Sequence, residues 1–229
     1  MISICMGIKN GGPYIREQID SILPQLGVED ELVVSDDGST DNTRPLIEWY
    51  RDPRIKLMSN PGHGLISNFE NCLKASRGEF IFLSDQDDVW HPEKVQVMTE
   101  VLRSCDLAVC DCQVVDEALN PIYPSFFKFN RSRQGLLRNF IKNSFMGCCM
   151  AFHRRVLEKA LPFPDNVPIH DQWIGLVAER YFTVKFVPKI MVDHRRHREN
   201  YSSTGGPSIN SIKKKLKTRF HLAKNLFTP

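Results

Sequence analysis

Residues 79–90 read EFIFLSDQDDVW, a short apolar run that ends in three carboxylates within four positions. Residues 31–41 read ELVVSDDGSTD and repeat this order. An apolar run of this length, bounded by turn-forming residues, is typical of a buried strand. Both strands are therefore expected to end in an acidic loop. The carboxylates that directly follow the two predicted strands are Asp36, Asp37, Asp85, Asp87 and Asp88.

Around these two stretches, apolar runs alternate with segments of helical spacing. Strands are expected at residues 2–8, 31–35, 55–58, 80–83, 107–112 and 148–152. Helices are expected at residues 15–26, 42–50, 65–75, 92–102 and 171–181. This alternation predicts an α/β domain with a mostly parallel central sheet flanked by helices. Ligands bind beyond the carboxyl ends of the strands in such sheets, so we expect the acidic loops to meet there.

Composition indicates one globular domain with a basic tail. The 229 residues are 41% hydrophobic and 25% charged, ordinary values for a well-buried domain. Residues 206–229 hold six Lys/Arg and no Asp/Glu, so residues 1–205 carry 24 basic against 27 acidic residues. A mildly acidic body argues against a nucleic-acid binder, which needs a basic face.

Cysteine usage and the start of the chain indicate a compartment. Seven cysteines without a CxxC pair favour buried free thiols in a reducing cytoplasm over disulfides or a zinc site. The chain begins with a strand-like run, without the basic region, apolar core and cleavage site of a leader. No run of about 18 apolar residues occurs. We therefore expect a cytoplasmic protein that does not span the membrane.

The two acidic loops allow more than one interpretation. Three carboxylates within residues 85–88 repel each other unless a cation joins them, and oxygen ligands favour Mg²⁺ or Mn²⁺. A solvated acidic turn explains the same residues without a metal. In the earlier loop, Asp41 or Ser39 could cap the next helix. Capping does not account for Asp36 and Asp37, where a carboxylate could accept hydrogen bonds from a nucleobase or a ribose hydroxyl.

Six segments, in order, carry a resemblance to a known family. They are NGGPYIREQIDSIL, VVSDDGSTDNT, GEFIFLSDQDDVWHPEK, NSFMGCCMAF, HDQWIGLVA and HRRHREN. Together they resemble family-2 glycosyltransferases with the GT-A (Rossmann-like) fold, in particular a bacterial rhamnosyltransferase-like branch, over residues 1–205. The resemblance implies metal-dependent, inverting transfer from a UDP- or dTDP-sugar to a saccharide or lipid-linked saccharide in the synthesis of O-antigen or capsule.

The resemblance also implies roles for individual residues. The residues implied to bind the nucleotide are Ile8, Asp36, Asp37, Asn68, Asp85 and Gln86. Those implied to hold Mn²⁺ or Mg²⁺ are Asp85, Asp87 and His197. The candidates for contacts to phosphate or acceptor are His170, Trp173, Arg195 and Arg198.

Asp171 is implied to be the catalytic base. An inverting transfer needs a carboxylate that removes the proton of the acceptor hydroxyl as its oxygen attacks the anomeric carbon, opposite the leaving diphosphate. The metal stabilises the charge on that leaving group. Without the resemblance, Asp171 would be read as a helix N-cap and His197 as a surface residue.

Three positions depart from the family pattern. Lys9 stands where the family has an aromatic residue near the base, so stacking on the base is not expected there. In the last motif, His194 replaces a common Tyr and Arg198 replaces a common Gly. Acceptor contacts are therefore expected to differ from those of the family.

The basic tail, residues 206–229, has apolar residues near helical spacing with lysines between them. This pattern is typical of an amphipathic helix at an anionic membrane surface. An ordinary helix that docks on the domain and leaves its basic face in water explains it equally simply.

Two other functions compete with glycosyl transfer. A nucleotidyltransferase that forms nucleotide sugars would also bring carboxylates and a metal to this edge, but it should carry a Gly-rich phosphate loop, which only residues 9–12 vaguely match. A non-catalytic module that binds nucleotide sugars would keep the fold without the chemistry. The retained Asp171, Asp85 and Asp87 argue against that module.

Overall fold

The computed structural model describes residues 1–198, 200 and 212–227, with the backbone alone for residues 212–218. The first half of the chain alternates strands and helices as expected. Its elements are β1 (Ile2–Ile8), α1 (Ile15–Ile22), η1 (Leu23–Gln25), β2 (Glu31–Asp36), α2 (Thr43–Glu48), β3 (Ile55–Ser59), α3 (Gly64–Ala75) and β4 (Phe80–Ser84).

The second half is less regular and contains short elements that the sequence pattern did not predict. Its elements are β5 (Val89–Trp90), α4 (Lys94–Leu102), β6 (Leu107–Val115), β7 (Pro121–Tyr123), α5 (Phe126–Asn130), α6 (Leu136–Ile141), η2 (Gly147–Cys149), β8 (Met150–His153), α7 (Arg154–Ala160), α8 (His170–Tyr181), β9 (Val184–Arg195) and α9 (Ile212–Phe227).

All described strands join one sheet in the order β3-β2-β1-β4-β8-β6-β9-β5, with β7 paired to β6. The strands from β3 to β4 are parallel, and their register sets Ile8 beside Asp36 and Met6 beside Ser84. Their carboxyl ends therefore meet at one edge, and the α/β prediction is confirmed. The other half is mixed, because β8 is antiparallel to both of its neighbours while β6 and β9 are parallel.

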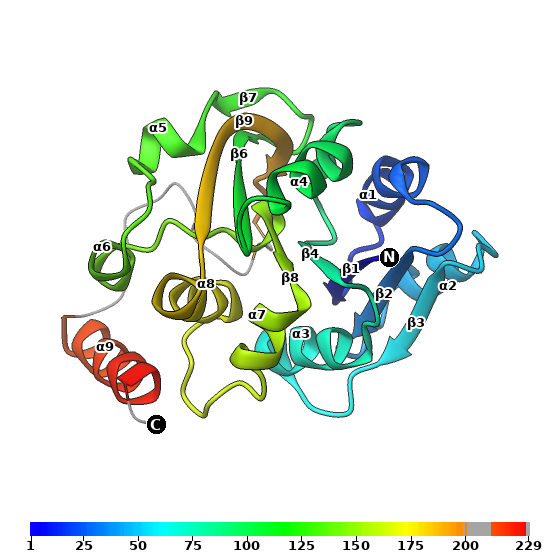
Figure 1. Cartoon of the computed structure of the whole chain (residues 1–229). Coiled ribbons are helices and arrows are strands. Elements are labelled where there is room, and N and C mark those ends of the chain that lie inside the picture. The colour runs from blue at the N-terminus through cyan, green and yellow to red at the C-terminus, as the bar shows by residue number, and fades with distance from the viewer. Residues whose placement is uncertain (199, 201–211, 228–229) are drawn as a thin grey trace.

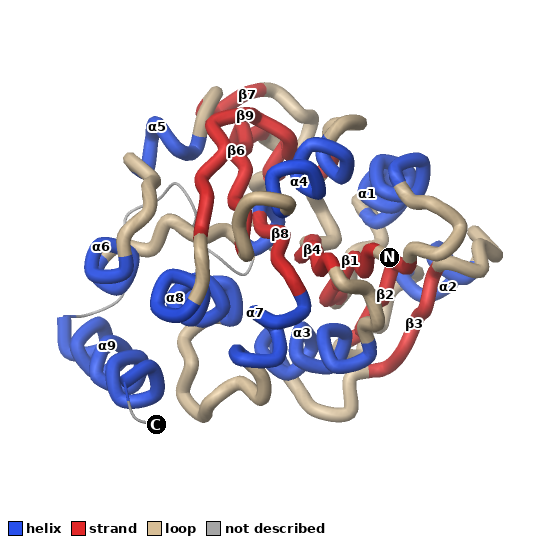
Figure 2. The backbone as a smooth tube through the Cα atoms, viewed as in Figure 1, coloured by secondary structure: helices blue, strands red, loops and turns tan. Residues whose placement is uncertain are grey.

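Helices cover both faces of this sheet. Figures 1 and 2 show α1 and α4 on one side of the strands and α3, α7 and α8 on the other. Every residue of β2 is buried, as its continuous apolar run requires for a strand with helices on both faces. In α1, Ile15, Ile19 and Ile22 form the buried face at helical spacing.

Two parts of the chain differ from the expected pattern. The long strand β9 was not predicted, because Lys185, Pro188 and Lys189 interrupt its apolar residues. The expected strand at residues 148–152 begins only at Met150, and the two cysteines before it belong to the turn η2.

The described part of the basic tail docks on the domain. Leu222 and Leu226 of α9 are buried, and α9 contacts α6 and α8. The expected start of the tail, at residues 206–211, lies outside the described residues. Within the described residues, no helix is both long enough and apolar enough to cross a bilayer.

Candidate active site

The loops that follow β1, β2 and β4 are tied together at the carboxyl edge of the sheet. The backbone N–H of Asp37 donates to the carbonyl of Ile8 at 2.9 Å. Gln86 and Lys9 exchange two hydrogen bonds, of 2.8 and 3.0 Å, between the Gln86 side chain and the Lys9 backbone. Asn68 of α3 donates to the Ile8 carbonyl at 3.0 Å. The sites predicted at Ile8, Asn68 and Gln86 therefore fix the shape of this edge.

Asp37 lies at the centre of this edge and is held in its charged form. Its carboxylate accepts hydrogen bonds from Asn60 (2.8 Å), from the backbone N–H of Gly64 (3.0 Å) and from Lys9 (3.1 Å). Burial raises the pKa of Asp37, but these hydrogen bonds and the Lys9 charge outweigh it and lower the pKa below its usual range. Lys9, at the position of the family's aromatic residue, thus forms an ion pair with Asp37.

Asp36, also predicted to bind the nucleotide, is buried and has protein partners. It accepts hydrogen bonds from the backbone and hydroxyl of Ser39, and it forms an ion pair of 3.1 Å with Arg44. These contacts shape the loop after β2. Asn68 differs, because its side-chain oxygen is buried and has no partner among the described residues.

Asp87 and His197 come together although 110 positions separate them in the sequence. His197 Nε2 lies 2.8 Å from Asp87 Oδ2, and the Asn200 side chain donates to the same oxygen at 3.0 Å. The His197 ring stacks on Tyr14, with 4.7 Å between the ring centroids. The Asp87 carboxylate is the kind of ligand that Mg²⁺ and Mn²⁺ take together with water and phosphate, and the imidazole beside it offers a nitrogen atom as a further ligand.

Asp85 belongs to a neighbouring group on the same loop. The ligand atoms of Asp85, Asp88, Cys148 and His194 all lie within 4.8 Å of one another. Within the described residues, the half-buried Asp85 carboxylate accepts no hydrogen bond. Burial and the charges of Asp88 and Asp87 raise the pKa of Asp85 well above its usual range. A carboxylate in this condition fits a site that is completed by a cation.

Asp88 and His194 form a fully buried pair behind Asp85. His194 Nδ1 lies 2.9 Å from Asp88 Oδ1, and the backbone N–H of Arg195 donates to the same oxygen at 3.0 Å. Burial lowers the pKa of His194, but the charge of Asp88 raises it more, to well above its usual value. His194, one of the departures from the family pattern, thus neutralises the last carboxylate of the acidic loop.

Asp171 lies at the start of α8, under the turn η2. Its carboxylate accepts hydrogen bonds from the backbone N–H of Gly147 at 3.1 Å and of Gln172 at 2.5 Å. Burial raises the pKa of Asp171 to about 7. A carboxylate with this pKa can take up a proton near neutral pH, as a general base must.

The other residues predicted to contact phosphate or acceptor, which are His170, Trp173 and Arg198, differ from one another in burial and partners. His170 is buried, stacks on Phe69 with 3.8 Å between the centroids, and has no partner at either ring nitrogen among the described residues. Burial lowers the pKa of His170 to about 3, so its ring is neutral. Trp173 donates to the Ala160 carbonyl at 2.9 Å inside the domain. Arg198 is exposed.

Arg195 is buried and its guanidinium contacts protein groups. It donates to the backbone carbonyls of Asp87 at 3.0 Å and Glu117 at 2.8 Å, and it pairs with Glu17. The hydrogen bond to Asp87 fixes the backbone of the acidic loop, residues 85–88.

Several residues that build the site were missed by the sequence analysis. Gly147 and Cys148 lie in the NSFMGCCMAF segment, which supported the resemblance without a role for any single residue. Lys94 is fully buried and donates from Nζ to the Cys148 carbonyl at 2.5 Å, which fixes the turn η2 next to Asp171. Gly147, Cys148 and Asn200 lie in motifs that carry the resemblance, and this was a signal that could have been used, whereas Lys94 had none beyond its place in the segment GEFIFLSDQDDVWHPEK.

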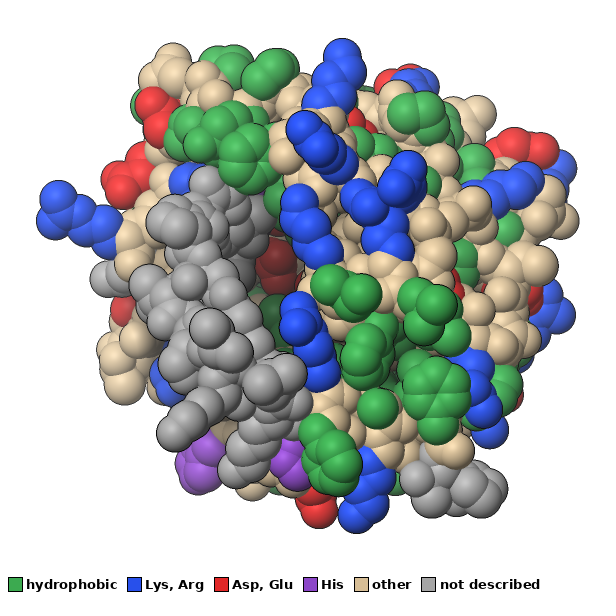
Figure 3. Space-filling model, turned by 90° about the vertical axis from the view of Figure 1, so that its left-hand side faces the viewer, with side chains coloured by type: hydrophobic (Ala, Val, Ile, Leu, Met, Phe, Trp, Pro, Cys, Tyr) green, Lys and Arg blue, Asp and Glu red, His purple; other side chains and the backbone are tan. Residues whose placement is uncertain are grey.

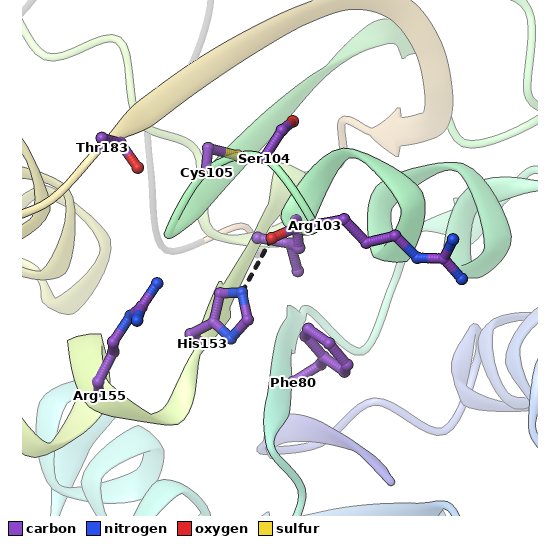
Figure 4. Close-up of a pocket in the computed structure, with 8 residues that line it drawn as sticks. Phe80, Arg103, Ser104, Cys105, His153, Arg155 and Thr183 are labelled. Atoms are coloured by element: carbon purple, nitrogen blue, oxygen red, sulfur yellow. Dashed lines mark hydrogen bonds between the residues drawn. The ribbon is translucent and has the colours of Figure 1, made fainter.

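A separate pocket of about 520 Å³ opens at the opposite ends of the strands (Figure 4). It lies beside the first residue of β4 and the last residue of β8, so it does not join the acidic edge. Its lining residues are Phe80, Leu102, Arg103, Ser104, Cys105, His153, Arg155 and Thr183. None of the predicted site residues lies there.

The family model for glycosyl transferase family 2 matches residues 3–161, which include the acidic edge. The chain belongs to this family. Among curated relatives of family 2, it is 29% identical over 187 residues to the UDP-Glc:alpha-D-GlcNAc-diphosphoundecaprenol beta-1,3-glucosyltransferase WfgD of Escherichia coli, which covers 78% of this chain and 70% of WfgD. The chain spans 53% of the length of the first curated relative it matches and 66% of the next two.

Solved structures of glycosyltransferases share the fold. S. aureus TarS in complex with UDP-GlcNAc matches 100% of this chain and 68% of its own, with a TM-score of 0.76 at 20% identity. Glucosyl-3-phosphoglycerate synthase from Mycobacterium tuberculosis, in complex with Mn²⁺, UDP and glucosyl-3-phosphoglycerate, matches 86% of this chain and 72% of its own, with a TM-score of 0.61 at 22% identity. The predicted GT-A fold and family are thus confirmed, whereas the rhamnosyltransferase-like branch stays a prediction.

Proposed function

We propose that this chain is a metal-dependent, inverting glycosyltransferase that moves a sugar from a UDP- or dTDP-sugar to a hydroxyl group of a saccharide or lipid-linked saccharide. The observation that carries the proposal is the position of Asp171. Its carboxylate has a pKa of about 7 and accepts a hydrogen bond from Gly147, and the next residue, Cys148, has its sulfur within 4.8 Å of the Asp85 carboxylate. The turn η2 thus contacts both the proposed proton acceptor and the acidic edge.

The nucleotide would bind along the edge formed by the loops after β1, β2 and β4. Asp37 offers a charged acceptor for a nucleobase N–H, and Lys9 beside it offers a donor. The unpartnered side-chain oxygen of Asn68 supplies a further acceptor. Support comes from the UDP complexes of TarS and the Mycobacterium tuberculosis synthase, which share this fold.

Asp87 and His197, together with Asp85, would hold Mn²⁺ or Mg²⁺. Asp87 pairs with His197, and Asp85 lies on the same loop in the neighbouring group with Asp88 and His194. A carboxylate oxygen from each Asp suits either ion. When bound, the ion stabilises negative charge on the leaving nucleoside diphosphate. The chain's own part is to hold these ligands, because Arg195 fixes the backbone of Asp87 and Asn200 orients its carboxylate.

Asp171 would accept the proton of the acceptor hydroxyl at its carboxylate. The acceptor oxygen attacks the anomeric carbon, the bond from that carbon to the diphosphate breaks, and the proton moves to Asp171. The backbone N–H of Gly147 and the start of α8 keep the carboxylate oriented in both protonation states. Neutral His170 would offer a hydrogen bond to the donor or acceptor without adding a charge.

One relative supports a proposal for the biological setting. The printed name of WfgD contains a diphosphoundecaprenol acceptor, which supports a lipid-linked saccharide and a role in surface polysaccharide synthesis, such as O-antigen or capsule. The enzyme would then work in the cytoplasm, peripherally on the inner face of the membrane, with the tail of residues 206–229 near anionic lipid. The donor sugar, the linkage and the rhamnosyltransferase-like branch are part of this proposal.

Calorimetric titration tests the proposal with UDP, dTDP, GDP and CDP, each with Mn²⁺ and with EDTA. Tight binding of one diphosphate that EDTA abolishes is the expected result. Asp87→Ala should lose that binding, whereas Asp171→Asn should bind normally and fail in transfer; the exposed Asp165→Asn serves as the matched control. Absence of binding under every condition would point to the non-catalytic module, and synthesis of a nucleotide sugar from a nucleoside triphosphate would point to the nucleotidyltransferase.

A further inference from the structure

One side of the molecule combines exposed apolar side chains with a local excess of Lys and Arg. The segment of residues 126–142, which contains α5 and α6, has five Lys/Arg and no Asp/Glu. The helix α9 has six Lys/Arg and no Asp/Glu in its sequence. The helices α6 and α9 lie on the same side of the molecule as α5 (Figure 1). A hydrogen bond joins α9 to α6, because the Arg219 guanidinium donates to the Ile141 carbonyl at 2.8 Å.

Several large apolar side chains on this side of the molecule are exposed to solvent. Leu137 is 77% exposed and Ile141 is 64% exposed, and their spacing of four places both on one face of α6. Phe220 of α9 is 67% exposed and Phe129 of α5 is 46% exposed. Figure 3 looks onto this side and shows hydrophobic and Lys/Arg side chains interspersed over it. We call Phe129, Leu137, Ile141 and Phe220 with the basic residues around them the α6 face.

The basic residues of the α6 face form no ion pairs within the described part of the chain. Among the described residues, no Asp or Glu forms an ion pair with any of the following: Lys128, Arg131, Arg133, Arg138, Lys142 and Arg219. A second copy of this chain would bring the same positive charge to the contact, which opposes self-association. Apolar side chains that project between cations instead fit the interface of an anionic lipid layer.

The α6 face is connected to the proposed catalytic base. Asn139, on the buried side of α6, donates to Glu179 of α8 at 2.9 Å, and Gln172 of α8 donates to the Asn139 carbonyl at 3.3 Å. Gln172 directly follows Asp171. A surface bound at α6 would therefore lie next to α8, whose first turn contains Asp171.

We propose that the α6 face binds the surface of an anionic phospholipid bilayer, with Leu137 and Ile141 inserted between headgroups and Arg131 and Arg133 over the lipid phosphates. The role of this binding, which is to bring Asp171 to a lipid-linked acceptor, rests on the proposed function, whereas the binding itself does not. It differs from attachment by a free basic tail, because the insertion site belongs to the folded domain and α9 serves as its flank.

Co-sedimentation of the full chain with vesicles tests the proposal. Vesicles of mixed phosphatidylglycerol and phosphatidylcholine should bind the chain at about 50 mM salt. Vesicles of pure phosphatidylcholine at the same lipid concentration should not bind it. Arg131→Gln with Arg133→Gln should weaken the partition coefficient about 25-fold, since each basic residue near such a surface contributes roughly fivefold. Leu137→Asp with Ile141→Asp should weaken it at least as much.

Matched controls separate this result from misfolding and from general charge. Val28→Asp changes a side chain that is 89% exposed near β2, on another part of the surface, and should leave vesicle binding unchanged. Each variant should bind nucleoside diphosphate like the wild type. Equal binding to neutral vesicles, or unchanged binding of the Leu137→Asp and Ile141→Asp variant, would overturn the proposal.

Two further outcomes are distinguishable. In the first outcome, the wild type is a dimer in analytical ultracentrifugation, the Leu137→Asp and Ile141→Asp variant is a monomer, and neither binds vesicles. This result would identify the α6 face as a contact between copies and overturn the lipid proposal. A wild type that binds anionic vesicles through this face but binds no nucleotide would leave the lipid proposal standing and remove the proposed function.

Discussion

The rate of sugar transfer should depend steeply on pH, because Asp171 has to be ionised to accept a proton. Burial raises the pKa of Asp171 to about 7, against hydrogen bonds from Gln172 and Gly147 that lower it. At pH 5, two units below this pKa, about 1% of the carboxylate is ionised. Transfer should therefore rise about 50-fold between pH 5 and pH 7, where half of the carboxylate is ionised, and about twofold more above pH 7, measured as release of nucleoside diphosphate at saturating substrates.

Asp171→Asn removes the proton acceptor and keeps the local structure. The amide oxygen of Asn can still accept the hydrogen bond from Gly147, so α8 should begin at the same residue. The rate of transfer should fall by about 10²- to 10⁴-fold, the usual contribution of a general base. Calorimetric affinity for the nucleoside diphosphate should stay within about twofold of the wild type.

The same substitution, which lowers the rate of transfer, should raise the stability of the folded chain. The raised pKa means that the folded chain resists ionisation of Asp171, and this cost builds up as pH rises from the unfolded pKa near 4 to about 7. Above pH 7 the wild type carries the full cost, at most about 4 kcal/mol, and Asn carries none. The Tm of Asp171→Asn should therefore exceed that of the wild type at pH 8 by more than at pH 5.

A flat rate profile between pH 5 and pH 8 would refute this reasoning, because it would show an ordinary Asp that is ionised throughout. An active Asp171→Asn enzyme would refute the assignment of the base directly. If the substitution lowered the Tm equally at both pH values, Asp171 would act as a helix cap alone.

The remaining predictions concern other contacts. His197→Ala should weaken Mn²⁺-dependent binding of nucleoside diphosphate at least tenfold while Mn²⁺-independent binding is unchanged, measured by calorimetry; equal affinity would show that Asp87 does not need the imidazole. Gly175→Ala should cost about 1–3 kcal/mol in urea unfolding, because an added Cβ would lie 2.3 Å from the Phe145 ring, and an unchanged midpoint would contradict this packing. Leu222→Ala should cost about 2–4 kcal/mol and expose α9 to limited proteolysis before the rest of the chain, whereas equal protection would show that α9 is not held by its buried face.

The two halves of the sheet differed in how far the sequence could predict them. The parallel half follows from local patterns, since β1, β2 and β4 are continuous apolar runs that end in turn-forming residues. The strand β9 could not be found in this way. Its lysines face outward near its start, and the strand exists because β6 supplies hydrogen bonds over most of its length.

The candidate site shows the same division. The sequence identified Asp85, Asp87, Asp171 and His197 as residues with chemistry, largely through the order of motifs. It could not show that Asp85 and Asp87 have different neighbours. Asp85 lies near Cys148 and His194, whereas Asp87 forms a hydrogen bond with His197.

By itself the sequence determined the strands that end in carboxylates, because each depends on residue types within a short segment, and the order of six motifs indicated the family and pointed to Asp171 as the proposed base. Only the tertiary structure decided the pKa of Asp171, the burial of the Asp88 and His194 pair, and the α6 face. A pKa depends on how much water the fold removes around a carboxyl group, and a surface depends on which side chains the fold leaves uncovered. Both are properties of contacts between residues far apart in the chain.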